Sequence, residues 1–184
     1  MGVSAGLRYR FTVDQYHRMG ALGVFHPDCR VELLDGEIFE MTPVDPWHAG
    51  VVDWLNEWFI RALAGRAVVR VQNPIGLDDR SEPQPDLILL RPQRDFYRSA
   101  HPGPGHAFLV IEVANTSLRH DRSRKLPLYA RADLQEVWIV NRSADIIEVF
   151  AEPSRSGYRA HRVASRAITS RRPPFPIVGS SSMT

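Results

Sequence analysis

One segment in the middle of the chain restricts the possible folds more than any other. Residues 107–113 are apolar throughout except for Glu112. A continuously apolar run of this length is typical of a β-strand that is covered on both faces of its sheet. The run therefore predicts a central strand with layers of structure on either side, and it places a carboxylate where an unpaired charge is costly.

Turn and capping residues predict the elements around this strand. Thr12 and Gln15 fit the capping-box pattern, which indicates a helix over residues 12–22. Asp35-Gly36 is a strong signal for a two-residue hairpin turn. The other elements expected from periodicity and turn residues are a long helix at 46–65, a short helix at 123–132 that is limited by Pro127, and strands at 30–34, 37–41, 67–72, 86–90, 136–140, 146–150 and, at an edge, 158–163.

The order of these elements indicates an α/β or α+β domain with a mixed central β-sheet flanked by helices. With 184 residues, the chain is long enough for one domain with a substantial core. We expect that domain to span residues 1–170. Residues 171–184 contain prolines and a serine run, so we expect a loosely ordered C-terminal tail there.

The composition is that of an ordinary soluble protein, with 43% hydrophobic and 24% charged residues. No apolar run approaches the roughly 18 residues that a membrane span needs, and the first residues include no stretch typical of a signal peptide. The single cysteine, Cys29, excludes an internal disulfide, so the expected location is the cytoplasm. A net charge of +2 is too small to indicate nucleic-acid binding by itself.

Lys125 is the only lysine among the 23 lysine and arginine residues of the chain. Arginine replaces lysine well as a surface charge, but poorly where a compact ammonium group must reach one atom. Lys125 also follows two acid-bearing strands, one starting at Asp86 and one containing Glu112. Chance survival, or an ion pair with Asp121 four residues earlier on a helix, is the structural alternative to a chemical role.

Asp86 and Glu112 form a candidate metal site. Two carboxylates at the ends of adjacent strands can hold one Mg²⁺, which prefers oxygen ligands and usually retains water and substrate phosphate. Such a cation lowers the pKa of a bound water and neutralises charge on a phosphodiester, while Lys125 can orient the attacking hydroxide or stabilise phosphoryl oxygens. The structural alternatives are a turn-capping role for Asp86 and an ion pair between Glu112 and an arginine.

Several short motifs follow one another in a set order: Arg30–Ile38, Met41, His48, Gln84–Leu87, Val110–Val113, a helix with Lys125, and Glu136–Asn141. In this order and spacing the chain resembles the Uma-type family of restriction-endonuclease-like proteins, within the PD-(D/E)xK nuclease superfamily, over about residues 10–165. The resemblance implies a restriction-endonuclease-like core, acids on a central hairpin that bind Mg²⁺, and phosphodiester hydrolysis.

The chain departs from the superfamily pattern at one position. The pattern places a lysine two residues after the second acid, where this chain has Ala114. The resemblance implies that the lysine has moved to the following helix, which points to Lys125. This replacement works only if that helix packs against the C-terminal end of the strand that carries Glu112.

Other residues are candidates for supporting roles. Glu32, on the first hairpin, is a candidate third metal ligand and catalytic residue, with an ion pair to an arginine as the alternative. His48 and Gln84 are candidate nucleic-acid contacts, although a capping or packing role would also explain His48. The basic segment 119–125 adds three more candidate nucleic-acid contacts: Arg119, Arg122 and Arg124.

These residues favour a Mg²⁺-dependent nuclease acting on DNA, with Mn²⁺ as a substitute cation. The alternative is a nuclease-fold domain without activity that binds nucleic acid or a protein partner, because the acid-x-lysine spacing is missing. Either protein could be a homodimer, since cleavage of both strands of a duplex needs two sites. With no separate DNA-reading motif in the sequence, any sequence specificity would come from loops such as 78–82 and 91–106.

Overall fold

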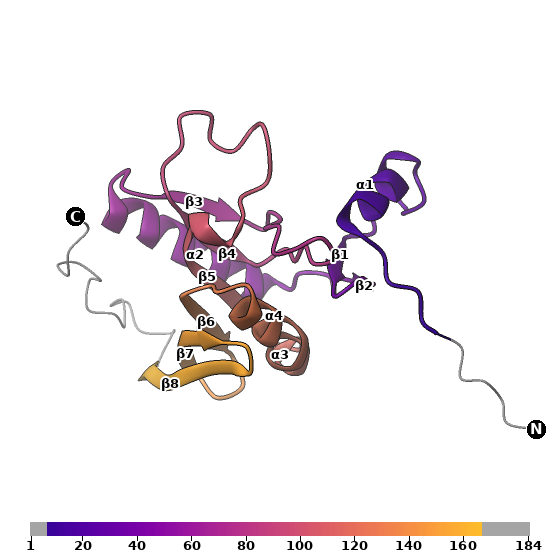
Figure 1. The fold of residues 1–184 in the computed structure, drawn as a ribbon. Coiled ribbons are helices and arrows are strands. Elements are labelled where there is room, and N and C mark those ends of the chain that lie inside the picture. The colour runs from indigo at the N-terminus through magenta and orange to yellow at the C-terminus, as the bar shows by residue number, and fades with distance from the viewer. Residues whose placement is uncertain (1–6, 167–184) are drawn as a thin grey trace, which may run out of the picture.

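A mixed β-sheet forms the centre of the computed structural model, which describes residues 7–166 of the chain (Figure 1). Every pair of neighbouring strands in this sheet is antiparallel except β5 (Ala107–Ala114) and β6 (Glu136–Asn141), which are parallel. This arrangement confirms the mixed central sheet expected from the sequence. In their order across the sheet, the strands are β3 (Val68–Val71), β4 (Leu87–Leu90), β5 (Ala107–Ala114), β6 (Glu136–Asn141), β7 (Ile146–Ser154) and β8 (Gly157–Arg166).

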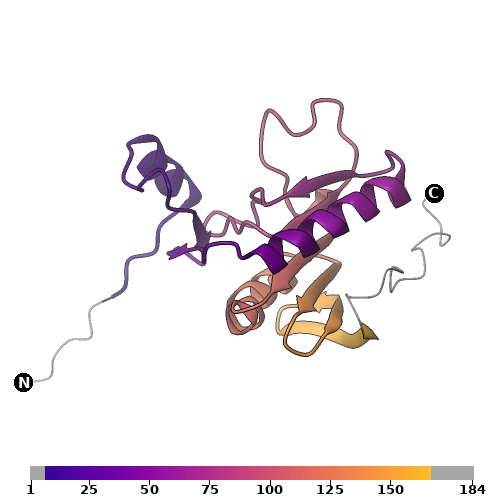
Figure 2. The same ribbon diagram turned by 180° about the vertical axis from the view of Figure 1, so that it is seen from behind.

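One face of the sheet is covered by the long helix α2 (Pro46–Leu63), which lies behind the strands in Figure 1 and in front of them in Figure 2. The carboxylate of Asp45 caps this helix by accepting hydrogen bonds from the backbone N–H groups of Trp47 and His48. The helix expected at 46–65 is confirmed. The buried contacts come from Val51, Val52, Leu55 and Phe59 of α2 and from alternate strand residues, among them Leu87, Leu89, Leu109, Ile111, Val113, Trp138 and Val140.

The opposite face is covered by a continuous helical segment made of α3 (Leu118–His120), the π-helical turn η2 (Asp121–Lys125) and α4 (Leu126–Arg131). The expected start near Ser123 was wrong, because the segment begins at Leu118. Pro127 has no N–H to donate, and just before it the N–H of Leu126 bonds to the carbonyl of Asp121, five residues back. The wider π turn thus carries the helix across the proline. Buried on this face are Ile88, Leu90, Val110, Tyr129, Leu134, Val137 and Ile139.

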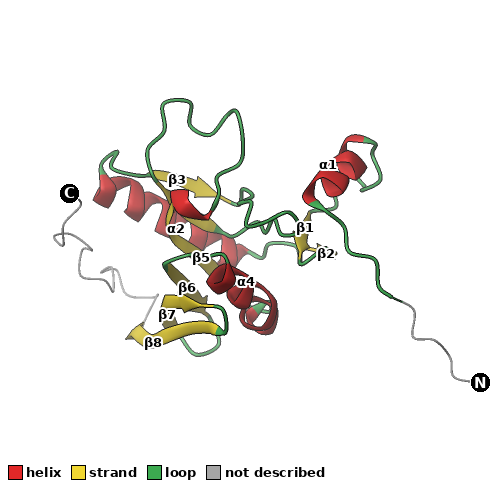
Figure 3. Cartoon of the chain, viewed as in Figure 1, coloured by secondary structure: helices red, strands yellow, loops and turns green. Residues whose placement is uncertain are grey.

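The N-terminal part forms a separate two-stranded sheet at one side of the fold (Figure 3). Helix α1 (Val13–Ala21) has the expected capping box between Thr12 and Gln15. Strands β1 (Val31–Leu34) and β2 (Glu37–Glu40) follow as an antiparallel hairpin. Its turn residues, Asp35 and Gly36, have φ values of 51° and 74°, as a type I′ turn requires.

The register of β4 and β5 sets up the functional end of the sheet. Leu87 of β4 pairs with Ile111 of β5, so Asp86 and Glu112 follow at the same end of the strand pair. The opposite ends are joined by the loop 91–106, which includes a short 3₁₀ turn, η1 (Pro104–His106), and rises from the sheet in Figure 1. The edge strand expected at 158–163 is confirmed as β8, which is longer than predicted.

The proposed division of the chain into residues 1–170 and a tail stays a prediction, because the tail lies outside the described residues. Within residues 7–166, no helix has the length and apolar character that would let it cross a lipid bilayer.

Candidate active site

A pocket of about 270 Å³ opens where β4 begins and β5 ends. One wall is the hairpin and the segment after it, and the other is the start of the helical segment 118–131. All four predicted catalytic residues line the pocket. The lining residues include Arg30, Glu32, Phe39, Glu40, Asp45, His48, Gln72, Gln84, Asp86, Glu112, Asn115, Ser117, His120, Asp121 and Lys125.

Asp86 is 7% exposed and is fixed by three neighbours. Its Oδ2 accepts a hydrogen bond from the backbone N–H of Val113 (2.8 Å), which ties it to the end of β5. Its Oδ1 lies 3.1 Å from Nε2 of His48 and accepts from Nε2 of Gln72 at 3.2 Å. Burial alone would raise the pKa of Asp86, but the imidazole of His48 lowers it below its ordinary value, so the group is a carboxylate at neutral pH.

Lys125 is buried between two glutamates that come from different parts of the fold. Its Nζ lies 3.1 Å from Oε2 of Glu32 and 3.3 Å from Oε1 of Glu112. The hydroxyl of Tyr129, one helical turn further along, donates to Oε1 of Glu112 at 2.5 Å. The helix therefore packs against the end of β5 in the way that a displaced lysine requires, although this contact does not itself establish a catalytic role.

Glu32 also joins the hairpin to the core. Its Oε2 accepts from the backbone N–H of Gln84 at 3.1 Å, and its Oε1 lies 3.4 Å from Nε2 of His120. Burial would raise the pKa of Glu32, but the ammonium group of Lys125 together with these hydrogen bonds lowers it. Gln84 makes a further bond from its side chain to the carbonyl of Val31 (2.9 Å), so it fastens the hairpin in addition to lining the pocket.

Negative charge is in excess in the pocket. Glu32, Asp86, Glu112 and Asp121 are all buried around Lys125. Burial raises the pKa of Glu112 well above its ordinary value, because Lys125 offsets the loss of hydration only in part and the other acids repel the charge. The pKa of Asp121 is raised for the same main reason. Four acids thus face one lysine and the imidazole of His48, and this imbalance contributes to the raised pKa of Glu112 and of Asp121.

Asp121 is a site residue whose importance the sequence did not reveal. The sequence suggested it only as an i,i+4 partner of Lys125. The structure places its buried carboxylate in the pocket wall, where Oδ2 accepts from the hydroxyl of Ser117 at 2.7 Å. The signal was present, because Asp121 lies four residues before Lys125 and eight before Tyr129, which brings all three side chains to one helical face.

His48 lies on the first turn of α2 and faces the pocket. Its bond to Asp86 raises the pKa of the imidazole, against the effect of burial. The Nδ1 atom is buried and has no hydrogen-bond partner among residues 7–166. His48 therefore holds Asp86 from the side of α2, and a contact with nucleic acid stays a prediction.

The three arginines predicted to bind nucleic acid differ in their surroundings. Arg122 donates to the buried carboxylate of Glu148 on β7 at 2.5 Å, so it links η2 to the sheet. Arg124 lies 3.7 Å from Glu37 and stacks over Phe39. Arg119 is exposed and forms no ion pair within the described part of the chain. Arg119 is therefore the one of the three whose charge is available to a ligand without breaking a contact.

The donor set fits a hard divalent cation, because the pocket offers buried carboxylate oxygens and an excess of negative charge. Within the described residues, however, no three histidine, cysteine or acidic side chains are already grouped as a metal site. Glu112 is engaged by Lys125 and Tyr129, and Glu32 by Lys125 and Gln84. A cation held by Asp86 and Glu112 would have to share Glu112 with Lys125.

Comparison with known proteins identifies the family of this chain. The sequence matches the Uma2 family, described as a putative restriction endonuclease family, over residues 13–179. The chain belongs to the Uma2 family. The motif order noted in the sequence and the pocket lined by Asp86, Glu112 and Lys125 lie within the matched residues.

A solved structure supports the same fold for this Uma2 chain. It is the crystal structure of a putative nuclease belonging to DUF820 from Anabaena variabilis, with a TM-score of 0.61, 11% sequence identity and coverage of 83% of each chain. At this identity the likeness shows the fold alone. No curated protein matches the sequence.

Proposed function

We propose that this protein is a Mg²⁺-dependent nuclease that hydrolyses phosphodiester bonds in DNA, with Mn²⁺ as a substitute cation. One observation carries the proposal: two buried carboxylates, Asp86 and Glu112, meet at the ends of adjacent strands, and Lys125 lies 3.3 Å from Glu112. Buried charges of one sign that exceed their counter-charges are expensive in a purely structural role. Membership of a family described as a putative restriction endonuclease family supports the same chemistry.

Asp86 and Glu112 are the residues that would hold the cation, with Glu32 and Asp121 contributing negative charge from the pocket walls. When bound, the cation supplies positive charge that eases ionisation of a water molecule and offsets charge developing on the phosphodiester. Asp86 is suited to this task because His48, Gln72 and the N–H of Val113 fix its two oxygens.

Lys125 acts as a fixed positive charge in this proposal and not as a proton acceptor. Burial alone would lower the pKa of its ammonium group, but Glu112, Glu32 and the other acids raise it above its ordinary value. The group therefore stays protonated throughout the pH range of a working enzyme. A fixed ammonium beside Glu112 can stabilise negative charge on phosphoryl oxygens as it develops.

The proposal is tested by the cleavage of supercoiled plasmid and of matched single-stranded DNA in Mg²⁺, in Mn²⁺ and with EDTA. Wild-type protein should nick or linearise DNA only with a divalent cation, and Asp86→Asn and Glu112→Gln should each lose activity by about a hundredfold or more, the range seen when a charge-stabilising group is removed. Glu57→Gln is the matched control, because Glu57 lies exposed on α2 and pairs only with Arg61 in the described structure. Cleavage that persists in EDTA, or in Asp86→Asn, would overturn the proposal.

A second candidate function is supported by the engagement of Lys125. Its ammonium group is already held by two carboxylates, and Ala114 occupies the place of the superfamily lysine. A nuclease-fold domain without activity would bind nucleic acid or a protein partner in EDTA. Its Asp86→Asn variant would have the same affinity as the wild type. Absence of cleavage together with unchanged binding would favour this function.

Homodimerisation also belongs to the proposal, because cleavage of a duplex on both strands is simplest with two sites. Light scattering at two protein concentrations measures the mass directly. A mass of one chain at all concentrations would leave the nuclease proposal intact but would limit it to single-strand nicking.

A further inference from the structure

The loop 91–106 presents one large aromatic side chain to solvent. Phe96 has an exposed fraction of 67%, and within residues 7–166 no other ring or guanidinium group stacks on it. Its neighbours Arg94 and Arg98 are also exposed, and neither forms an ion pair in the described part of the chain. The Nε of Arg98 donates to the backbone carbonyl of Asp95 at 3.1 Å, but neither arginine faces a carboxylate of the described residues, so both positive charges are left without a counter-charge there, beside an exposed ring.

The backbone of this loop is bent sharply at Phe96 and Tyr97 and is held there by local hydrogen bonds. Phe96 and Tyr97 are successive residues with φ values of 52° and 58°, in the left-handed region that side chains disfavour. Asp95 stabilises the turn, because its carboxylate accepts from the N–H of Tyr97 at 3.1 Å and from the hydroxyl of Ser99 at 2.7 Å. Strain that is stabilised by local bonds is typical of functional segments.

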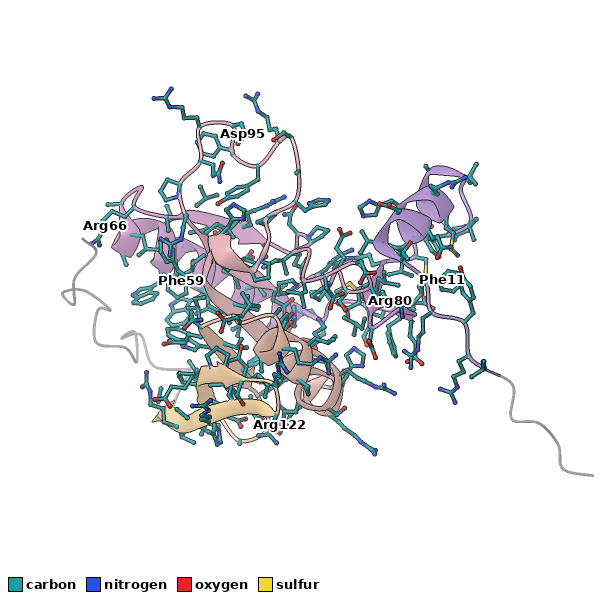
Figure 4. All side chains as sticks on the ribbon, viewed as in Figure 1. Phe11, Phe59, Arg66, Arg80, Asp95 and Arg122 are labelled. Atoms are coloured by element: carbon teal, nitrogen blue, oxygen red, sulfur yellow. The ribbon has the colours of Figure 1, made fainter. Side chains whose placement is uncertain are left out.

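Tyr97 anchors the loop and determines which way Phe96 points. The ring of Tyr97 is buried against His106, and its hydroxyl donates to the carbonyl of Arg91 at 2.6 Å. Because Tyr97 faces the core, the adjacent Phe96 projects outward. Figure 4 labels Asp95, the residue before Phe96, at the end of the loop that is furthest from the sheet.

We propose that residues 94–98 are a nucleic-acid contact in which Phe96 stacks on an exposed base or enters a base step, while Arg94 and Arg98 bind the flanking phosphates. Aromatic rings beside guanidinium groups bind bases of any sequence, and apolar side chains also wedge between base pairs of a duplex. The inference rests on the proposed function for the identity of the ligand class, and it assigns the loop to holding the strand and not to cleaving it.

The position of the loop is compatible with this role. It joins the ends of β4 and β5 that lie opposite Asp86 and Glu112. A strand rises about 3.3 Å per residue, so β4 separates the pocket from the base of the loop by about 13 Å, and residues 91–95 extend by at most about 17 Å more. The pocket and Phe96 therefore lie within about one helical turn of DNA, which is about 34 Å. A nucleic acid of about one helical turn or more is therefore long enough to contact the loop and the pocket together.

The test measures binding of the full chain to a fluorescein-labelled duplex and to its single strand by anisotropy, in EDTA so that nothing is cleaved. Phe96→Ala should weaken binding by about tenfold, as expected for the loss of one stacked base, without changing the slope of log K against log salt. Arg94→Gln and Arg98→Gln should each reduce that slope by about one, because each removes one phosphate contact. Comparison of the two probes distinguishes stacking on an unpaired base from wedging into a duplex.

Two variants control for nonspecific effects. Ile60→Ala removes an exposed apolar side chain from α2, and Arg155→Gln removes an exposed arginine from the turn between β7 and β8. Both should bind as wild type does. Equal binding by Phe96→Ala and wild type, equal weakening by Ile60→Ala, or no binding of either probe would overturn the inference.

The outcome is separable from that of the proposed function. If Phe96→Ala weakens binding but the protein never cleaves DNA in Mg²⁺, the loop assignment stands and the nuclease proposal fails. If the protein cleaves DNA and Phe96→Ala changes neither binding nor KM, the nuclease stands and the loop assignment fails. When both hold, Phe96→Ala should raise KM and leave kcat unchanged, because the contact is made equally in the ground and transition states.

Discussion

The two ends of the β4–β5 strand pair have opposite electrostatic character. At one end, Asp86 and Glu112 are buried among further acids, and the carboxylate oxygens of both have hydrogen-bond or ion-pair partners. At the other end, the loop 91–106 exposes Phe96 between two arginines that lack carboxylate partners in the described structure. In the functions proposed above, the acidic end accepts a cation and the basic end accepts an anionic polymer.

This difference shows how a chain with a net charge of only +2 can suit a nucleic-acid ligand. Net charge sums over the whole surface, whereas binding depends on where unpaired charge lies. Arg122 and Arg124 sit in the basic segment 119–125 but are engaged by Glu148 and Glu37. The segment that looks most basic in the sequence is therefore partly committed to structure.

The largest expected effect on the free energy of unfolding comes from replacing Lys125 at the acidic end. Lys125→Met leaves Glu32 and Glu112 buried without their counter-charge, and loss of one partner from a buried ion pair costs about 3–5 kcal/mol. Urea unfolding of the variant measures this loss of free energy. Adding Glu112→Gln should restore part of it, because Gln carries no charge and still accepts from Tyr129. A Lys125→Met protein within about 1 kcal/mol of wild type would contradict the tight charge pairing described here.

A smaller effect is expected at Arg122, which pairs with the other acid buried in an apolar strand. Arg122→Ala should destabilise the protein by about 1–2 kcal/mol in urea unfolding, less than for Lys125, because the arginine is half-exposed and Glu148 retains Asn141 and His161. The salt dependence of DNA binding should not change. Arg119→Ala is the control, with the reverse pattern of unchanged stability and a lower salt slope. A lower slope of log K against log salt for Arg122→Ala would mean that Arg122 contacts nucleic acid after all.

The smallest effect on stability is expected at the basic end. Phe96→Gly places glycine at a left-handed backbone position that phenylalanine disfavours, which should raise the free energy of unfolding by up to about 1 kcal/mol. The greater freedom of glycine in the unfolded chain offsets part of this gain. The same variant should bind nucleic acid more weakly. A fall in stability of more than about 1 kcal/mol would mean that Phe96 packs in the fold, which would remove the reason for its exposure.

Local signals in the sequence predicted local structure well. The capping box at Thr12, the Asp35-Gly36 turn and the periodicity of residues 46–65 each depend on neighbours within a few residues, and each element formed as expected. The helical segment at 118–131 was misjudged at its start, because Pro127 was taken as a limit and the π turn that accommodates it depends on packing against the sheet.

The site could be predicted in part. Glu112 and Glu148 give the same sequence signal, an acid inside an apolar strand, yet one lines the pocket with Lys125 and the other pairs with Arg122 on η2. The sequence singled out the first because of its motif and said nothing of the second. Which partner each acid finds depends on how the helical segment crosses the sheet, and that arrangement is set by long-range packing that no local pattern records.

The most direct test of the central claim is isothermal titration of Mg²⁺ into wild type, Asp86→Asn and Glu112→Gln, with Glu57→Gln as the surface control. The account predicts saturable binding by the wild type and the control, and loss of binding in both pocket variants, because the excess negative charge of the pocket is what holds the cation. Equal Mg²⁺ affinity in Asp86→Asn and wild type, or no binding by the wild type at millimolar Mg²⁺, would contradict it.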